Sequence, residues 1–243
     1  MAAPAPDVRR RVLDAALPCF LDDGLERTTV AAIRARAGVS NGALFHHFAS
    51  KEAIADALFV EAMASFQEGL WALLEQKPRT PRAAVRGAIT HQLTWIEEHP
   101  DLARFLYMRG QVSWDAPAGA EVARLNRDLA AALRAWMAPL IEAGAVRPLS
   151  TLLITAIVTA PGHAVAQRWL AGQLEDGATP LRYADDLIDA AVAGLSGTPS
   201  RARRAAAPVP ASGRIVVELL DADGAVLSRG ETTAPLRPPE PSS

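Results

Sequence analysis

The sequence predicts an all-α protein that joins an N-terminal helix-turn-helix domain to a larger C-terminal helical domain. Two observations carry this prediction. Between residues 28 and 57, short apolar patterns with helical spacing lie on either side of a glycine-containing turn. From residue 61 to about residue 197, patterns of the same period are separated by proline or glycine. The 243 residues, 50% of them hydrophobic, are enough for one or two domains with a core.

The first sixty residues contain a three-helix pattern. Residues 7–23 read as the first helix, in which Pro18 should remove one backbone hydrogen bond and kink the helix. A second short helix follows and ends at a turn around Gly38, and Ser40 can cap a third. Two short helices joined by such a turn form a helix-turn-helix, expected at about 29–48, which places its second helix in a DNA major groove.

The charge pattern supports a surface that faces DNA. Between residues 27 and 51 there is no Asp or Glu, whereas four basic residues are present, namely Arg27, Arg34, Arg36 and Lys51. A phosphate-facing surface requires this freedom from negative charge. The outer side of the expected recognition helix is small and polar at Ser40, Asn41 and Gly42, so its backbone can approach base edges.

Lys51 stands directly after Ser50, which can cap a long helix. A cation at a helix N-terminus opposes the helix macrodipole. Two interpretations are open: a docked DNA phosphate attracts both the lysine and the free amide groups, or the side chain simply reaches solvent. The rest of the motif favours the phosphate.

Five short motifs follow one another at a defined spacing: Asp23-Gly24, Thr29-Val30, Ala37-Gly38-Val39-Ser40, Phe45-His46-His47-Phe48 and Ser50-Lys51-Glu52. With them, about residues 7 to 60 resemble the tetracycline-repressor (TetR) family of bacterial transcription regulators. The resemblance implies DNA contacts from Thr28, Thr29, Ser40, Asn41, Gly42, Phe45, His46, His47 and Lys51. Phe45 stands where the family usually has a Tyr, so a hydroxyl that bonds phosphate is lost.

The DNA-binding domain is therefore expected over 7–60, and a helical ligand-binding and dimerisation domain over 61–197. The expected helices of the second domain are 51–76, which begins in the first domain, 81–99, 101–109, 119–143, 149–171 and 179–195. The resemblance implies that the last two long helices pair in a homodimer, through about 149–195. Their apolar faces are broader than one neighbouring helix can cover, although a monomeric core is the alternative.

The same resemblance implies a ligand cavity in the second domain. Bulky side chains with polar handles gather there, and such side chains are typical of small-molecule sites. The candidate ligand-binding residues are Trp95, Phe105, Tyr107, Met108, Trp136, His163 and Trp169. Pro161 and Gly162 can kink the helix beside this cavity. His163 then either contacts ligand or is a core histidine bonded to a backbone carbonyl.

Composition changes at Thr198. Residues 198–213 are rich in Pro, Ala and Arg and read as a linker. An Asp-Gly pair between two β-branched runs indicates a short β-hairpin over 214–232. The Pro-rich residues 233–243 are expected to be disordered.

Several classes of protein are disfavoured. No HExxH, GxSxG, P-loop or GxGxxG motif is present, so neither an enzyme nor a cofactor site is expected. The single cysteine, Cys19, lies among apolar residues, and no metal site is expected. The start of the chain lacks the apolar region of a signal peptide, and the run from Leu149 to Pro161 is too short to span a membrane, which together indicate a cytoplasmic protein.

These patterns predict a sequence-specific DNA-binding transcriptional regulator. Its partners are expected to be double-stranded operator DNA, a second copy of the chain and a small-molecule ligand, with no membrane. A repressor released by a small hydrophobic or aromatic ligand is the expected form. The alternative is a helical interaction protein without operator binding.

Overall fold

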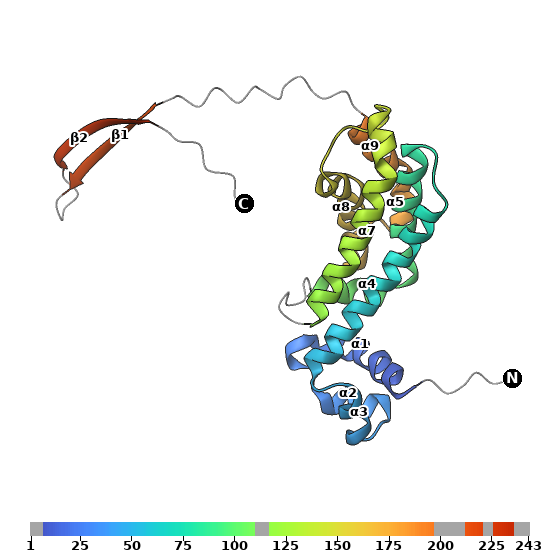
Figure 1. Cartoon of the computed structure of the whole chain (residues 1–243). Coiled ribbons are helices and arrows are strands. Elements are labelled where there is room, and N and C mark those ends of the chain that lie inside the picture. The colour runs from blue at the N-terminus through green and yellow to red at the C-terminus, as the bar shows by residue number, and fades with distance from the viewer. Residues whose placement is uncertain (1–6, 110–116, 197–211, 221–225, 236–243) are drawn as a thin grey trace. The chain divides into compact units, whose positions relative to one another are not determined.

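The computed structural model of the chain describes residues 7–109, 117–196, 212–220 and 226–235, and it divides the chain into two units, Met1–Gly197 and Thr198–Ser243. The elements are α1 (Val8–Arg27), α2 (Val30–Ala37), α3 (Asn41–His47), α4 (Lys51–Glu75), α5 (Pro81–Glu98), α6 (Pro100–Arg109), α7 (Pro117–Glu142), α8 (Thr151–Leu170), a 3₁₀ turn η1 (Pro180–Tyr183), α9 (Ala184–Ser196), β1 (Ser212–Leu220) and β2 (Val226–Pro235). The first unit is helical, which confirms the predicted all-α class (Figure 1).

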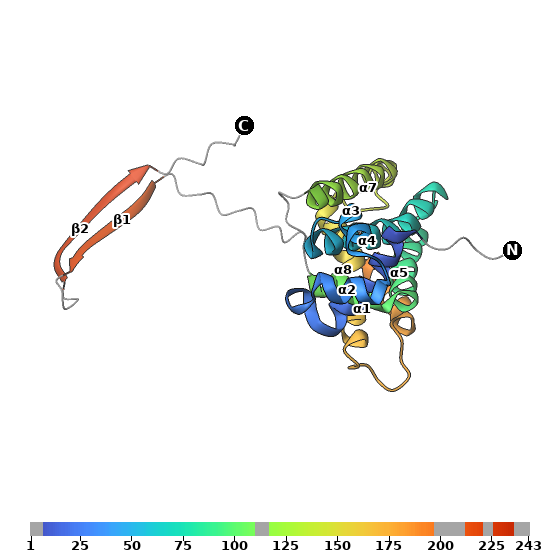
Figure 2. The same cartoon turned by 90° about the horizontal axis from the view of Figure 1, so that it is seen from below.

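The head of the molecule consists of α1, α2, α3 and the start of α4, and Figure 2 views the unit from this end. Helix α1 packs against α2, α3 and α4. The apolar core of the head is buried and includes Leu13, Phe20, Ile33, Leu44 and Ile54. These residues come from all four helices, so the head is held together by a core of its own.

Helix α1 departs from regular geometry at Gly24, not at Pro18. Gly24 has φ 79° and ψ 162° inside the segment, whereas Pro18 lies within the helical stretch. The break lies directly after residue 23, where the sequence predicted that the first helix ends. Gly24 carries the break because a residue without a Cβ adopts positive φ at low cost.

The body of the unit is a bundle in which α5 is central. Helix α5 packs against α4, α8 and α9, while α7 lies along α4 (Figure 1). A second apolar core joins these helices through Val85, Ile89, Leu93, Met137 and Ile188. Helix α4 contributes Ile54 and Leu58 to the core of the head and packs against α5 and α7, so it links the head to the body.

Helix α8 continues through Pro161 from Thr151 to Leu170, so Pro161 and Gly162 do not end the helix. Gly162 instead serves packing. A Cβ on Gly162 would lie 2.6 Å from the side-chain oxygen of Gln92 on α5. The Gln92 amide also donates to the carbonyl of Thr159 at 3.0 Å. Gly162 therefore makes room for a buried glutamine.

In the second unit, β1 and β2 form a two-stranded antiparallel hairpin with Ile215 opposite Thr232 and Glu218 opposite Arg229. The register is irregular between Leu219 and Leu220. The strands reach a few residues beyond the predicted hairpin at both ends. Most of the predicted linker and tail lies outside the described residues, as does the Asp-Gly turn.

Candidate DNA-binding surface and internal cavity

Three hydroxyl side chains begin the helices of the head. The Thr29 oxygen accepts from the backbone N–H of Ala32 at 3.2 Å and caps α2. Ser40 caps α3 through Ala43 at 3.1 Å. Ser50 caps α4 in the same way. Each cap satisfies a backbone donor that the helix leaves free, and such a cap typically stabilises a helix by about 1 kcal/mol.

The turn between α2 and α3 is fixed from both sides. Gly38 ends α2 in the left-handed conformation, at φ 62°. The guanidinium of Arg11 on α1 donates to the carbonyl of Ala37 at 2.8 Å and to that of Gly38 at 2.7 Å. The angle between the two short helices thus depends on a side chain from α1, which the local sequence pattern did not indicate.

The structure contradicts one of the predicted DNA contacts. Thr28 is 1% exposed. Its hydroxyl lies 2.9 Å from the carbonyl of Cys19 and 2.7 Å from that of Gly24, and shares its proton between them. The side chain therefore belongs to the interior, where it bonds to carbonyls on both sides of the break in α1. Its neighbour Thr29 is exposed.

The predicted DNA contacts on α3 and at its cap lie in one exposed region of the head. Exposed residues at the start of α3 and along its outer side are Ser40, Asn41, Gly42, Phe45, His46 and His47. The Phe45 side chain is 49% exposed although it is apolar. Leu44, by contrast, is fully buried and anchors the helix from below. The predicted surface therefore exists as a polar, exposed face.

Lys51 has a structural role that neither interpretation of the sequence included. Its ammonium donates to the backbone carbonyl of Glu26 at 2.6 Å and to that of Thr28 at 3.1 Å. These carbonyls lie where α1 ends, so the lysine compensates their partial negative charge. This explains a cation at the N-terminus of α4 without any bound anion. An ammonium has three donors, which leaves one for a further acceptor.

The basic residues near this face are not all equivalent. Arg36 lies 3.8 Å from the carboxylate of Asp22, and both side chains are more than half exposed. Arg27 donates to the carbonyl of Asp23 at 2.8 Å. The stretch without acids is thus bordered by an acidic side chain from α1, and an exposed pair of this kind contributes little to stability.

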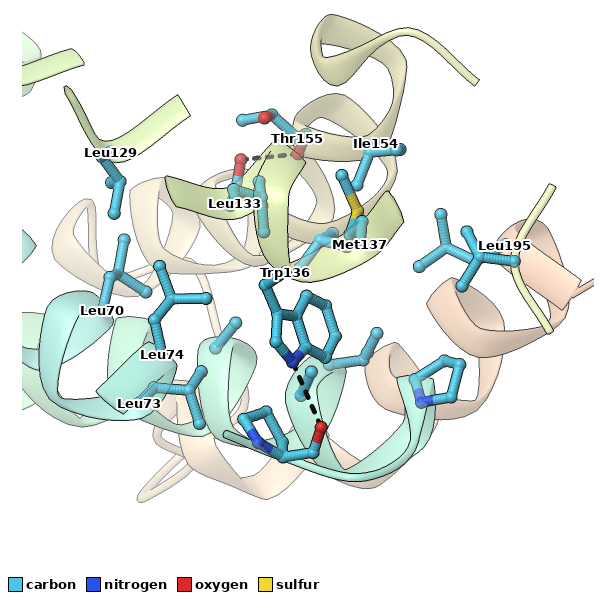
Figure 3. A pocket seen from close by; sticks show the side chains of 18 residues that line it. Leu70, Leu73, Leu74, Leu129, Leu133, Trp136, Met137, Ile154, Thr155 and Leu195 are labelled. Atoms are coloured by element: carbon cyan, nitrogen blue, oxygen red, sulfur yellow. Dashed lines mark hydrogen bonds between the residues drawn. The ribbon is translucent and has the colours of Figure 1, made fainter. Parts of the chain in front are cut away.

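The body contains an apolar cavity of about 140 Å³ between α4, α5, α7, α8 and α9. It is lined by Leu70, Leu73, Leu74, Pro78, Pro81, Ala84, Val85, Ala88, Leu129, Leu133, Trp136, Met137, Val146, Ile154, Thr155, Val158, Thr159 and Leu195 (Figure 3). Of the seven predicted ligand residues, only Trp136 lines this cavity. Its indole N–H donates to the carbonyl of Pro78 at 3.2 Å.

The other aromatic candidates do not form one cavity. Trp95 is buried in a separate cluster with Ile96 and Ala103, and its indole N–H reaches the hydroxyl of Ser65. Met108 is exposed, and Trp169 borders an open surface hollow near Gly172. Aromatic side chains fill space between helices well, which is why they gather in the sequence without marking the cavity.

Phe105 connects the body to the head. It is fully buried, and its ring stacks on Phe20 of α1 with centroids 5.8 Å apart. On the same helix, Arg109 forms a mostly buried ion pair with Asp56 of α4. The prediction that Phe105 lines a ligand cavity is therefore wrong, because the residue belongs to the core of the head.

Tyr107 and His163 form a bond between α6 and α8. The tyrosine oxygen lies 2.7 Å from Nδ1 of the histidine. Burial raises the pKa of Tyr107 to about 12 and lowers the pKa of His163. Both groups are thus neutral near pH 7. His163 is a core histidine, as one interpretation held, but its partner is a hydroxyl and not a backbone carbonyl.

The described residues contain no helix long and apolar enough to cross a membrane. In the part of the chain that the structure describes, no three His, Cys, Asp or Glu side chains gather as metal ligands would.

A helix-turn-helix head on a hollow helical body is the architecture of a regulatory protein, and comparison with known proteins gives the family. A family model described as bacterial regulatory proteins, tetR family, matches residues 12–58. The HTH-type transcriptional repressor AcnR of Corynebacterium glutamicum is 32% identical over 133 residues, which cover 45% of this chain and 71% of that protein. The chain therefore belongs to the TetR family.

Two further comparisons bear on the extent of the likeness. The HTH-type transcriptional repressor Rv1474c of Mycobacterium tuberculosis is 32% identical over 103 residues, or 40% of this chain, and the match spans 50% of that repressor. The crystal structure of the transcriptional regulator FadR from Bacillus subtilis in complex with stearoyl-CoA has a TM-score of 0.64 at 18% identity, covering 76% of this chain and 98% of that chain. The latter likeness concerns the fold.

Proposed function

We propose that this protein is a transcriptional repressor that binds operator DNA as a homodimer and leaves it when a small apolar ligand binds the body. The observation that carries the proposal is the exposed face of α3, fixed by the Ser40 cap and by Arg11. A rigid, small-residue surface of this kind suits a major groove. The related repressors AcnR and Rv1474c support the same role.

The dimer proposal rests on the exposed apolar side of α8. Leu152 is 77% exposed and Leu153 is 50% exposed, and the exposed side of α8 continues with Ala156, Ala160 and Ala164. A row of apolar residues in water favours association with a second copy. Ala160→Glu should convert the dimer to a monomer in sedimentation, whereas the exposed Ala131→Glu on α7 should leave the dimer intact.

Operator binding is tested with two variants that separate base contact from phosphate contact. The operator is sought in the DNA that flanks the coding region of this protein. Asn41→Ala should change which DNA sequence the protein binds most tightly. Lys51→Ala should weaken binding to all sequences and lower the salt slope by about 0.9. Fluorescence anisotropy at several salt concentrations measures both.

The slope is the decisive reading for Lys51, since this side chain also holds the end of α1. A purely structural role would lower affinity through partial unfolding and leave the slope unchanged. If the unaltered protein binds no sequence in the DNA that flanks its coding region, the proposal as a whole is contradicted.

The ligand of one structural neighbour does not fit the cavity of this chain. FadR of Bacillus subtilis was crystallised with stearoyl-CoA. A cavity of about 140 Å³ is smaller than such a molecule requires. Among the residues that the structure describes, its lining includes no Arg or Lys that would meet phosphate groups. The size and the lining of this cavity therefore determine which class of ligand it can bind.

A further inference from the structure

The cavity in the body offers almost no polar group to a ligand. Its lining includes three side chains with polar atoms, Trp136, Thr155 and Thr159. The indole N–H of Trp136 is bonded to the carbonyl of Pro78. The Thr159 hydroxyl donates to the carbonyl of Thr155 at 2.9 Å, one helical turn earlier (Figure 3). Thr155 itself is exposed, which places it at the rim.

The size of the cavity limits the ligand in a second way. An engineered apolar cavity of about 150 Å³ in another protein stays dry and binds benzene or xenon. The present cavity, at about 140 Å³, has nearly the same volume and a lining of the same chemistry. A single ring or a short branched hydrocarbon fills such a space.

The lining also excludes charge. No Arg, Lys or His belongs to it among the described residues. An ionised carboxylate or phosphate placed there would lose its hydration and gain neither an ion pair nor a donor. The buried position of Val85, Met137, Ile154 and Val158 closes the inner wall against water.

We propose that the cavity between α4, α5, α7, α8 and α9 binds a compact, uncharged hydrocarbon group about the size of one ring. Recognition depends on shape and apolar contact, and an anion of the same shape is rejected. That such a ligand releases operator rests on the function proposed above. Binding itself does not.

Toluene and benzoate are the matched probes, because both contain one phenyl ring, which carries a methyl group in toluene and a carboxylate in benzoate. Isothermal titration calorimetry of the full chain at pH 7 should detect toluene. Benzene should bind about fourfold more weakly, as loss of one buried carbon group predicts. Benzoate should bind at least about 100-fold more weakly. Equal affinities for toluene and benzoate would overturn the inference.

The site is tested by filling it. Ala88 on α5 lines the cavity, and Ala83 on the same helix is exposed. Ala88→Leu should weaken toluene binding at least about tenfold, and Ala83→Leu should leave it unchanged. If both variants bind toluene as the unaltered protein does, the ligand lies elsewhere and the assignment is wrong.

A measurement on the unaltered protein avoids any failure of Ala88→Leu to fold. The indole N–H signal of Trp136, identified by its loss in Trp136→Phe, should shift when toluene is added. The signal of Trp95, which lies in another cluster, should not. A shift confined to Trp95 would overturn the proposal.

The two proposals fail separately. If toluene binds and operator DNA does not, the cavity assignment stands and the regulatory function falls. If operator binds and toluene is not detected, the regulatory function stands and the inferred ligand class falls. Where both bind, toluene should lower operator affinity, and operator should lower toluene affinity by the same factor.

Discussion

The head and the body of this protein are built on different principles. In the head, side chains bond to backbone carbonyls across helices: Arg11 holds the turn, Thr28 holds the break in α1, and Lys51 holds the end of α1. The body has bonds of this kind too, such as that of Gln92 to Thr159, but there the apolar packing also leaves a cavity of about 140 Å³.

This difference suits two tasks. Bases are distinguished by donors and acceptors at fixed positions, so a head that reads DNA benefits from directional bonds that fix its angles. Apolar contact has no preferred direction, so the body can accommodate a ligand of variable orientation. The two parts meet in α4 and α6.

The largest effect is expected where the two regions join. Phe105→Ala removes a fully buried ring that stacks on Phe20. The free energy of unfolding should fall by about 3 to 5 kcal/mol, as for other buried aromatic side chains. Urea denaturation measures it. Phe45→Ala, in which the lost ring is exposed, should cost less than about 0.5 kcal/mol. If Phe105→Ala lowers the free energy of unfolding only slightly, the contact between Phe105 and Phe20 does not hold the head and the body together.

The sequence predicted much of the head because its determinants are local. Ser40 and Ser50 precede their helices directly, and Gly38 stands where a left-handed residue is needed. Thr28 and Thr29 show the limit. They are adjacent and chemically identical, and only the position of the α1 carbonyls decides that Thr28 turns inward.

The resemblance implied a cavity in this domain, but most of its lining was beyond prediction for a related reason. Its lining consists mainly of ordinary apolar residues such as Leu70, Ala88 and Leu129, which in the sequence read as core. A cavity arises where such side chains fail to meet, and this depends on the packing of five helices. Aromatic residues with polar handles, which drew attention in the sequence, instead fill contacts such as Trp95 with Ser65.

A smaller loss tests the directional bonds of the head. Thr28→Val keeps the shape of the side chain and removes the hydroxyl from two buried carbonyls. The free energy of unfolding should fall by about 1 to 3 kcal/mol. Thr90→Val, at an exposed position of α5, should change it by less than about 0.5 kcal/mol. Equal effects of the two substitutions in thermal unfolding would deny Thr28 its structural role.

The burial of His163 predicts a pH dependence. Because burial lowers the pKa of His163 in the folded state, the unfolded chain binds more protons as the pH falls below about 6.5. Stability is therefore full above that pH and declines toward pH 5, by at most about 1.4 kcal/mol per pH unit. Urea denaturation between pH 5 and 7.5 measures the slope.

Two variants identify the group responsible for this slope. His163→Gln should remove its share of the slope. Tyr107→Phe should retain that share, because burial and not the hydroxyl is the cause of the lowered pKa. An unchanged slope in His163→Gln would assign the dependence to other groups.

The smallest effect is expected from removal of the second unit. The helical unit ends at Gly197 and has cores of its own, whereas a two-stranded hairpin such as β1 with β2 is marginal in water when alone. A chain ending at Gly197 should therefore unfold at the same temperature as the full chain, within about 1 °C. It should also keep the same sedimentation behaviour and operator preference. Circular dichroism, sedimentation and anisotropy on the two chains measure these quantities.

At low salt the shortened chain should bind DNA somewhat more weakly, because Arg201, Arg203, Arg204 and Arg214 are removed and their attraction to phosphate is least screened there. If the shortened chain unfolds at a lower temperature or sediments as a monomer, the hairpin stabilises the helical unit. The stability of the helical unit would then depend on the second unit as well as on the head and the body.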